Sequence, residues 1–262
     1  MTTKKLMDRG KDCVLLLLWV GLVSAAACMA VERKAAATQP VGSGATTRPV
    51  DARPVSHPAG DANGMAELVL DLPRPAYKET PKDLNTPNLP PPDQRGKRPK
   101  FLVPAGCKNV AAGKGVTSSV KETVSGELKC ITDGDKEATE GSYVVLGEGT
   151  QWVQIDLEEA YRIYAIVIWH YHGVPKVYHD VVVQTSDDQD FIEKVTALFN
   201  ADYDNSSGLG VGKDRDYIEG FEGKIIDGKG TKGRYVRLYS KGSTTDGLNH
   251  YTEVEVYALP GK

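Results

Sequence analysis

The stretch Cys130-Ile-Thr-Asp-Gly-Asp135 forms an acidic turn, and the strand-like Trp152-Val-Gln-Ile-Asp-Leu157 follows it. A second acidic stretch, Glu253-Val-Glu-Val-Tyr257, lies close to the C-terminus. Carboxylates and backbone carbonyls are the ligands that calcium takes, and an Asp-Gly-Asp turn offers both within a few residues. The two stretches can share such an ion only if the fold brings the ends of the domain together. We therefore predict a domain whose early turn and last strand are neighbours.

Short runs rich in β-branched and aromatic residues dominate the chain beyond Pro104 and predict strands. These runs cover 153–157, 163–169, 177–185, 235–239 and 253–257. Gly, Asp and Ser separate them at intervals typical of β-sandwiches, and no amphipathic segment has the length of a helix. An all-β, antiparallel sandwich is the predicted fold, and this part of the chain is long enough to bury a core without disulfides.

The N-terminus has the layout of a secretory signal peptide. Basic residues at positions 4–11 precede an apolar run at 14–27 that ends in small residues and is short for a membrane span. We expect a signal peptide over 1–27 and export to the cell envelope.

The end of that run, Ser24-Ala-Ala-Ala-Cys28, resembles the bacterial lipobox. This resemblance implies a lipid anchor on Cys28, which would be the protein's sole contact with a membrane. Ala25 stands where the lipobox usually has Leu. Ordinary cleavage after Ala27 or Ala30, with Cys28 incidental, is the alternative.

Residues 28–100 are rich in Pro, Ala, Gly and Thr, and such a composition cannot bury enough apolar surface to fold. We predict a disordered tether there, with a short apolar island at 65–72, followed by one folded domain at 101–262. Cys107 and Cys130 are the cysteines of that domain, and an exported protein could bridge them or leave them free.

Composition also excludes some partners. The net charge is −3, and Lys and Arg are scattered along the chain instead of gathering in a basic stripe with aromatics. Nucleic-acid binding needs such a stripe, so we expect no nucleic-acid partner.

Several motifs recur in one order: Asn109-Val-Ala-Ala-Gly-Lys114, Thr132-Asp-Gly-Asp135, Trp152 to Leu157, Ser186-Asp-Asp188 with Phe191, Arg234-Tyr-Val-Arg-Leu238, and Glu253 to Tyr257. This ordered set resembles the discoidin-like, or coagulation factor type C, domain, whose fold carbohydrate-binding module family 32 shares. The resemblance covers about residues 105–260. It implies an eight-stranded, galactose-binding-like jelly roll with a structural Ca²⁺ and a ligand surface formed by loops at one end.

The resemblance also implies the metal ligands. The side chains of Asp133 and Glu253 would bind the ion, with backbone carbonyls and one Thr completing its shell. The full set is Cys130, Asp133, Asp135, Thr139, Thr252 and Glu253, where Thr139 stands one residue beyond the family's usual place. A solvated acidic turn is the alternative, since Asp-Gly is a common turn dipeptide.

Members that bind galactose-type sugars commonly place an Arg after the strand that corresponds to 163–169. This chain has Trp169-His-Tyr-His172 there, which departs from a galactose site but offers aromatic and polar groups for a sugar. The predicted ligand residues are Tyr143, Trp169, His170, His172, Tyr178, Asn249 and His250. The insertion at 202–214 resembles a calcium loop but lacks the closing Glu of an EF-hand.

His170 and His172 alternate on the predicted strand, and a tight hairpin would place His179 opposite His170. Three imidazoles on one face could hold a transition metal, which would make the protein a His-metal enzyme. No carboxylate base stands beside them in the sequence, so we favour a non-catalytic module. Carbohydrate is the first-choice ligand, and a cell-surface protein bound by an adhesion or scaffold module is the alternative.

Overall fold

The computed structural model describes residues 64–95 and 98–261 of the chain. The predicted signal peptide over 1–27, the lipid site at Cys28 and the tether up to residue 63 lie outside the described residues. Within the described ranges, no helix is long and apolar enough to cross a membrane.

Strands and two short 3-10 helices make up the regular structure of the described ranges. The strands are β1 (Met65–Glu67), β2 (Leu102–Pro104), β3 (Lys108–Asn109), β4 (Val116–Ser118), β5 (Val144–Glu148), β6 (Gln151–His170), β7 (Val182–Ser186), β8 (Thr196–Asn200), β9 (Lys224–Ser240) and β10 (Leu248–Pro260). The 3-10 helices are η1 (Pro92–Gln94) and η2 (Leu128–Thr132).

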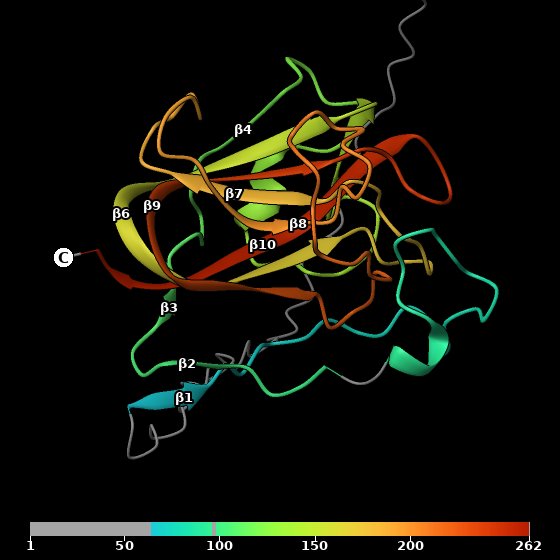
Figure 1. Cartoon of the computed structure of the whole chain (residues 1–262), viewed down its shortest axis with the longest axis horizontal. Helices are drawn as coiled ribbons and strands as arrows, with labels where there is room; N and C mark the ends of the chain where they lie inside the picture. The colour runs from blue at the N-terminus through green and yellow to red at the C-terminus, as the bar shows by residue number, and fades with distance from the viewer. Residues whose placement is uncertain (1–63, 96–97, 262) are drawn as a thin grey trace, which may run out of the picture. The chain divides into compact units, whose positions relative to one another are not determined.

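Eight strands form one antiparallel sheet in the order β3-β10-β6-β9-β7-β8, with β4 beside β6 and β5 beside β10. The long strands β6 and β9 are paired along most of their length and bend together, at the left of Figure 1. Glu158 and Lys229, both with positive φ, lie at this bend. The sheet therefore folds over into two layers, and the predicted eight-stranded, all-β jelly roll is confirmed.

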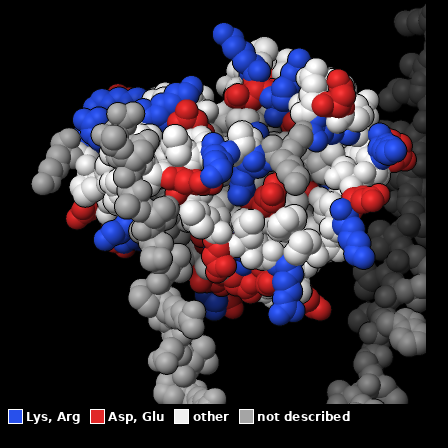
Figure 2. All heavy atoms as spheres, turned by 90° about the horizontal axis from the view of Figure 1, so that it is seen from below, with Lys and Arg blue, Asp and Glu red and all other residues white. Residues whose placement is uncertain are grey.

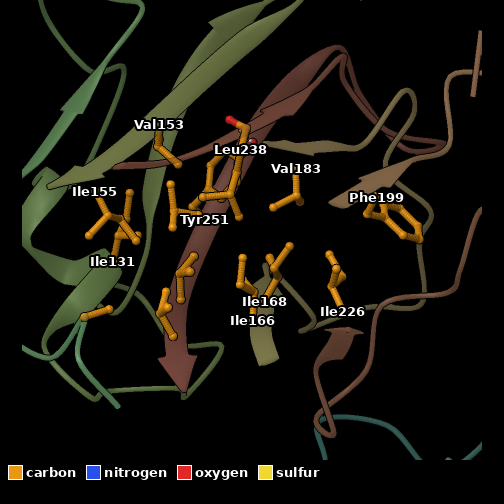
Figure 3. Close-up of a cluster of buried hydrophobic side chains, with 14 of the residues drawn as sticks. Ile131, Val153, Ile155, Ile166, Ile168, Val183, Phe199, Ile226, Leu238 and Tyr251 are labelled. Atoms are coloured by element: carbon orange, nitrogen blue, oxygen red, sulfur yellow. Dashed lines mark hydrogen bonds between the residues drawn. The ribbon is translucent and has the colours of Figure 1, made fainter. Parts of the chain in front are cut away.

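The core lies between these layers. Along β6, Val153, Ile155 and Leu157 are fully buried while Trp152 and Asp156 are partly exposed, which is the alternation expected of a strand with one face inward. Figure 3 shows how these side chains meet those of the other strands in one cluster. Truncating a core Leu or Ile to Ala typically costs ~2–5 kcal/mol, so this cluster is the main source of stability.

The strands depart from the sequence prediction in two places. The runs predicted at 153–157 and 163–169 are parts of the single strand β6, because the chain bends between them without ending the ladder. The strand predicted at 177–185 begins only at Val182. Val177 and Tyr178 are buried in a loop, where Tyr178 makes a single bridge to Ser243. The apolar residues before Val182 are thus explained by burial in the loop and not by strand pairing.

The predicted disordered tether is wrong for residues 64–95, which we call the N-terminal strap. The Asn88 amide donates to the carbonyls of Ala201 (2.9 Å) and Asp214 (3.0 Å), and the Thr86 hydroxyl donates to Asp216 at 2.5 Å. Thr86, Asn88 and Leu89 are consequently buried. Specific polar contacts with distant loops order the strap, and amino-acid composition alone does not predict such contacts.

The predicted domain boundary at residue 101 also needs correction. The apolar island at 65–72 begins with β1, and β1 pairs with β2 from the other side of that boundary. Arg98 then donates to the carbonyl of Glu222 in the sandwich. The strap and the sandwich are thus parts of one folded unit.

Cys107 and Cys130 are both free thiols and both buried. Cys107 packs in a small apolar cluster with Val103 and Ala165, and the Cys130 thiol points to the carbonyl of Gly141 at 3.6 Å. Each cysteine therefore behaves as a small buried side chain.

Charges of both signs are interspersed on the face shown in Figure 2. Ion pairs between surface residues, such as Lys100 with Glu67 at 2.7 Å, contribute to this pattern. The face shown carries no continuous basic field of the kind that follows a phosphate backbone.

Candidate functional site

The early acidic turn and the last strand are in contact. Asp133 follows η2, and Gly134 adopts a φ of +89°, a conformation that L side chains rarely adopt. This turn aims the Gly134 amide at Glu253 Oε2, 3.1 Å away on β10. The predicted juxtaposition of the turn with residue 253 is therefore present in the structure.

Two side-chain oxygens next to this contact have no hydrogen-bond partner among the described residues. These are Glu253 Oε1 and Thr252 Oγ1, and both are buried. Burial, together with the charge of Glu255, raises the pKa of Glu253 to about 8, against the opposing effects of the Gly134 amide and Lys136. A buried carboxylate oxygen facing no donor is expensive, and a cation would offset that cost. The side chains present therefore fit a calcium ion.

Lys136 does not serve as that cation. Its ammonium pairs with Glu255 at 2.8 Å, and both side chains are largely buried. The nearest lysine is thus already neutralised by a different carboxylate.

The remaining predicted metal ligands are engaged in the turn itself. Asp135 accepts the Ser142 hydroxyl at 2.8 Å and the Glu137 amide at 3.0 Å. The Thr139 hydroxyl lies 2.9 Å from that of Ser142. Cys130 contributes only its carbonyl in the prediction, and its thiol is directed elsewhere. Of the predicted set, Thr252 and Glu253 are the residues with buried side-chain oxygens left over.

Most predicted sugar contacts are buried and cannot form a surface. Trp169 and His170 are fully buried and Tyr178 is 2 % exposed. The Trp169 indole donates to the carbonyl of Phe221 at 2.9 Å, and His170 Nδ1 lies 2.7 Å from Glu219 Oε1. The prediction that Trp169, His170, His172 and Tyr178 contact ligand is wrong, because all four are buried. Partners about fifty residues away hold Trp169 and His170 in the core.

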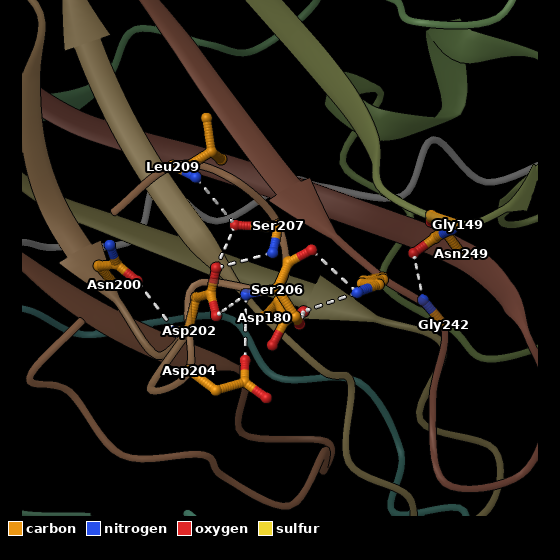
Figure 4. A network of polar contacts seen from close by, with 11 residues as sticks. Gly149, Asp180, Asn200, Asp202, Asp204, Ser206, Ser207, Leu209, Gly242 and Asn249 are labelled. Atoms are coloured by element: carbon orange, nitrogen blue, oxygen red, sulfur yellow. Dashed lines mark hydrogen bonds and ion pairs between the residues drawn. The ribbon is translucent and has the colours of Figure 1, made fainter. Parts of the chain in front are cut away.

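Asn249, also predicted as a ligand contact, holds loops together instead. Its amide nitrogen donates to the carbonyls of Gly147 and Gly149, and its oxygen accepts the Gly242 amide at 2.8 Å and the Ser240 hydroxyl at 2.7 Å. Figure 4 shows it between the Gly149 and Gly242 loops. Asn249 is fully buried, so its role is structural.

The three-histidine metal site is also wrong. β6 ends at His170, so His172 lies beyond the strand, where its Nε2 is 2.9 Å from the Lys136 carbonyl. His170 is occupied by Glu219. In the ranges that the structure describes, the side chains grouped closely enough to share a metal are those of Asp180, Asp202 and Asp204.

The loop end carries an aromatic cluster formed by Tyr143, Tyr171 and His250, in which the two tyrosines are partly exposed and the histidine is buried. The Tyr143 and Tyr171 rings lie 4.8 Å apart and are tilted by 56°, and each lies 6.0 Å from the His250 ring. Lys176 places its ammonium 5.1 Å from the Tyr171 ring centre. Tyr143 and His250 were predicted, whereas Tyr171 and Lys176 were missed, although both lie in the predicted loop from 169 to 178.

The cluster offers planar faces beside hydrogen-bonding groups. Burial, reinforced by the positive charge of Lys176, lowers the pKa of His250 to about 4, so its ring is neutral at pH 7. Lys176 pairs with Asp246 at 3.4 Å but is only 2 % exposed, so the hydrogen-bonding groups open to a ligand are the hydroxyls of Tyr143 and Tyr171. Tilted aromatic rings with a few oriented donors and acceptors match the apolar face and hydroxyls of a sugar ring.

The acidic group in the 202–214 insertion is satisfied by its own loop (Figure 4). Asp202 accepts the amides of Ser206 and Ser207, both at 2.9 Å, as well as the Ser207 hydroxyl. Asp180 accepts the Ser206 hydroxyl, and Asp204 accepts the Ser206 amide at 3.0 Å. The carboxylates therefore act as acceptors that shape the loop.

Residues 130–238 match the model of the F5/F8 type C family described as the NedA-like, galactose-binding domain. The match includes the end of η2 and the strands from β5 to most of β9, whereas the strap and β10 lie outside it. No curated protein matches the sequence.

Three solved structures are similar to part of this chain. The family 32 carbohydrate-binding module of AlyQ, in complex with 4,5-unsaturated mannuronic acid, is 19% identical with a TM-score of 0.38, over 54% of this chain and 92% of that one. A fucose-binding module of Streptococcus pneumoniae is 20% identical with a TM-score of 0.41, over 58% and 98%. A family 89 glycoside hydrolase from Clostridium perfringens is 17% identical with a TM-score of 0.44, and the 58% of this chain that matches spans 15% of the hydrolase.

Proposed function

We propose that this protein is a non-catalytic module that binds carbohydrate at its loop end, a function supported by the match of residues 130–238 to the galactose-binding domain of the F5/F8 type C family. The aromatic cluster of Tyr143, Tyr171 and His250 is the observation that carries the proposal. Loops at the end of a rigid sandwich can change chemically without disturbing the core, which makes them the usual place for ligand contacts.

In this proposal the partly exposed rings of Tyr171 and Tyr143 stack on the sugar, and the buried side chains of Lys176 and His250 pack against those rings and hold them in place. Tyr171 is favoured as the main stacking platform because its ring is only partly buried and the Lys176 ammonium lies 5.1 Å from its centre. A shallow platform of this kind binds one or two sugar residues weakly, so binding to an extended glycan would depend on several contacts.

We also propose that the turn at Asp133 holds one structural calcium ion, supported by the unpaired oxygens of Thr252 and Glu253. The Asp133 and Glu253 carboxylates would bind it, with carbonyls of the turn completing the shell. The ion would stabilise the fold by joining the turn to β10, with no part in the chemistry of the ligand.

Export and anchoring through Cys28 complete the proposal, supported by the sequence of the first 28 residues. Such an anchor would hold the binding module at the cell envelope. Mass spectrometry of the mature N-terminus tests this part, because lipid on Cys28 and a free N-terminus at Val31 differ in mass and sequence.

A glycan array probed with and without a calcium chelator tests the binding function. We expect a restricted set of glycans to bind, and Tyr171→Ala to reduce that binding at least tenfold with little change in melting temperature, because a partly exposed side chain contributes little to stability. Lys213→Ala, on the insertion away from the cluster, serves as the control. An array without any bound glycan, combined with retention of a cell-surface protein, would instead support the adhesion function.

A further inference from the structure

A groove lies between the strap and the segment that leads into β9, apart from the aromatic cluster and the acidic turn. Its volume is about 770 Å³, within the range of ~300–1,000 Å³ common for small-molecule sites. Strap residues between Ala76 and Arg95 form one wall, and residues 214–224 with Phe199 form the other. The groove thus combines the family's sandwich with a segment outside the family match.

Hydrogen bonds fix the strap as a wall of this groove. The Tyr77 hydroxyl donates to the carbonyl of Glu219, and Arg95 donates to the carbonyls of Pro90 (2.6 Å) and Leu84 (3.0 Å). Because both walls are tied in place, the groove does not depend on a ligand to form.

Lys224 is the residue of the groove whose charge has no counterion. Its ammonium lies 5.2 Å from the ring centre of Phe199 and 5.0 Å from that of Tyr217. It forms no ion pair or hydrogen bond with any described residue. The acids that influence it are Asp214, which accepts the Asn200 amide, and Glu219, whose Oε1 lies against His170 while its Oε2 has no hydrogen-bond partner among the described residues; neither carboxylate forms an ion pair with Lys224.

Desolvation accordingly lowers the pKa of Lys224. A partly desolvated cation without a partner is unfavourable, and aromatic rings compensate for only part of that cost. An anionic group placed in the groove would supply the missing partner.

The rim of the groove also carries positive charge. Lys78 and Lys82 are exposed, line the groove and make no hydrogen bond or ion pair within the described ranges. Of the acids in the lining, Asp214 and Asp216 accept hydrogen bonds from the protein, so Glu222 is the one whose side chain is free among described residues. The charged side chains of the lining are five basic ones (Lys78, Lys82, Arg95, Arg215 and Lys224) and three acidic ones (Asp214, Asp216 and Glu222), so the groove carries a net positive charge.

We propose that this groove binds a carboxylate-bearing sugar, a hexuronic acid residue, with Lys224 facing the carboxylate and the rings of Tyr77 and Phe221 flanking the sugar. The choice of a sugar as the carrier of the carboxylate rests on the proposed function, whereas the choice of an anion rests on Lys224 itself. Lys78 and Lys82 would add long-range attraction that salt weakens.

A matched pair of probes tests the proposal: methyl galacturonoside and methyl galactoside, which differ only in the carboxylate at C6. Both are titrated into the full chain and followed by NMR. We expect the uronide to bind at least tenfold more tightly than the galactoside and to shift signals of residues 214–224.

Three variants locate the charge. Lys224→Met keeps the apolar stem over Phe199 and should weaken uronide binding at least tenfold, whereas Lys224→Arg should keep it within threefold. Lys232→Met, an exposed lysine on the same strand, is the control and should change nothing. Galactoside binding should be the same in all three.

Uronide affinity within threefold of wild type in Lys224→Met, or equal affinity for both probes in the wild type, would overturn the proposal. The same titrations on Tyr171→Ala separate it from the proposed function. If the aromatic cluster binds no sugar, that variant binds both probes like the wild type, while the Lys224 comparison still gives its own answer.

Discussion

The acidic turn at 133–135 and the insertion at 202–208 are both short and rich in Asp, and in both the Asp side chains accept hydrogen bonds from their own loop. Only the turn lies against a further buried carboxylate, that of Glu253 on β10. In the insertion, Asp202 is fully buried and receives hydrogen bonds from Ser206 and Ser207. At the turn, Glu253 is fully buried and keeps one oxygen without a donor. The difference predicts that a cation binds where buried oxygens of an acidic group lack donors, and not where Asp residues are most dense.

Removal of calcium should reveal the largest difference in stability effects between the turn and the insertion. An ion that binds only the folded protein at a hundredfold excess over its Kd adds ~2.7 kcal/mol, which corresponds to a rise in melting temperature of roughly 5–10 °C for a domain of this size. We expect wild type to show this rise and Asp133→Ala and Glu253→Gln to lose it. Scanning calorimetry with calcium and with chelator measures the effect.

Glu140→Gln is the control for that experiment, since Glu140 is an exposed acid near the same turn. It should keep the full calcium response. A calcium response that persists in both Asp133→Ala and Glu253→Gln would remove the basis for the comparison.

Asp202→Ala should destabilise the protein by about 1–3 kcal/mol, because it leaves the amides of Ser206 and Ser207 without their acceptor. The loss should be the same with calcium and with chelator, since Asp202 acts as a hydrogen-bond acceptor. Asp204→Ala, which removes one exposed bond, is the matched variant and should cost much less. If Asp202→Ala abolished the calcium response, the insertion and not the turn would be the metal site.

The two acids should also respond to pH with opposite sign. Burial, helped by Glu255, raises the folded-state pKa of Glu253 above its ordinary value to about 8. Its contribution to stability is therefore present below about pH 4.5 and is lost as the pH rises through 8, by at most ~1.4 kcal/mol per pH unit. With chelator present, the free energy of unfolding should fall from pH 5 to 8 in wild type more steeply than in Glu253→Gln.

Asp202 should contribute no slope in that window. Burial pushes its pKa upward, but hydrogen bonds from Ser207 and Ser206 outweigh burial and lower it. Its contribution is present above its ordinary pKa and is lost only as the pH falls through the lowered one. Urea unfolding of Asp202→Ala between pH 5 and 8 should therefore parallel wild type, and a divergence would show that its carboxylate titrates there.

The smallest effect should come from Thr139. Its hydroxyl is already 2.9 Å from that of Ser142 on the turn, so it is poorly placed to serve as a metal ligand. We expect Thr139→Val to change calcium affinity by less than threefold, about 0.7 kcal/mol, as measured by calorimetric titration. A loss above tenfold would show that the hydroxyl leaves Ser142 to bind the ion.

The sequence was sufficient to predict the sandwich and the approach of residue 253 to the turn. Both follow from local signals: β-branched runs separated by turns, and acidic residues at the two ends of the domain. The calcium itself stays a prediction. The bend in β6 was not foreseeable as one strand, because Leu157 to Ile163 contains polar residues that read locally as a turn.

The failures at His170 and at the strap have a common physical cause. His170 is drawn inward by Glu219, and the strap is held because Asn88 satisfies the carbonyls of Ala201 and Asp214. Each case depends on a polar partner about fifty or more than a hundred residues away, in a segment without any local signal. Sequence patterns report which residues are polar, but not which of them will find a partner in the interior.

Because β6 and β9 run through both layers, the two layers should unfold together. In a sandwich of separate sheets, one layer can open while the other persists, but here Ile155 and Ile166 of one strand lie in the two different layers. Opening one layer would disrupt β6 and β9, which also form the other layer. A partly opened state would therefore gain little conformational entropy before the whole core is lost. The fold should therefore be cooperative, holding its loop end rigid up to a single sharp transition.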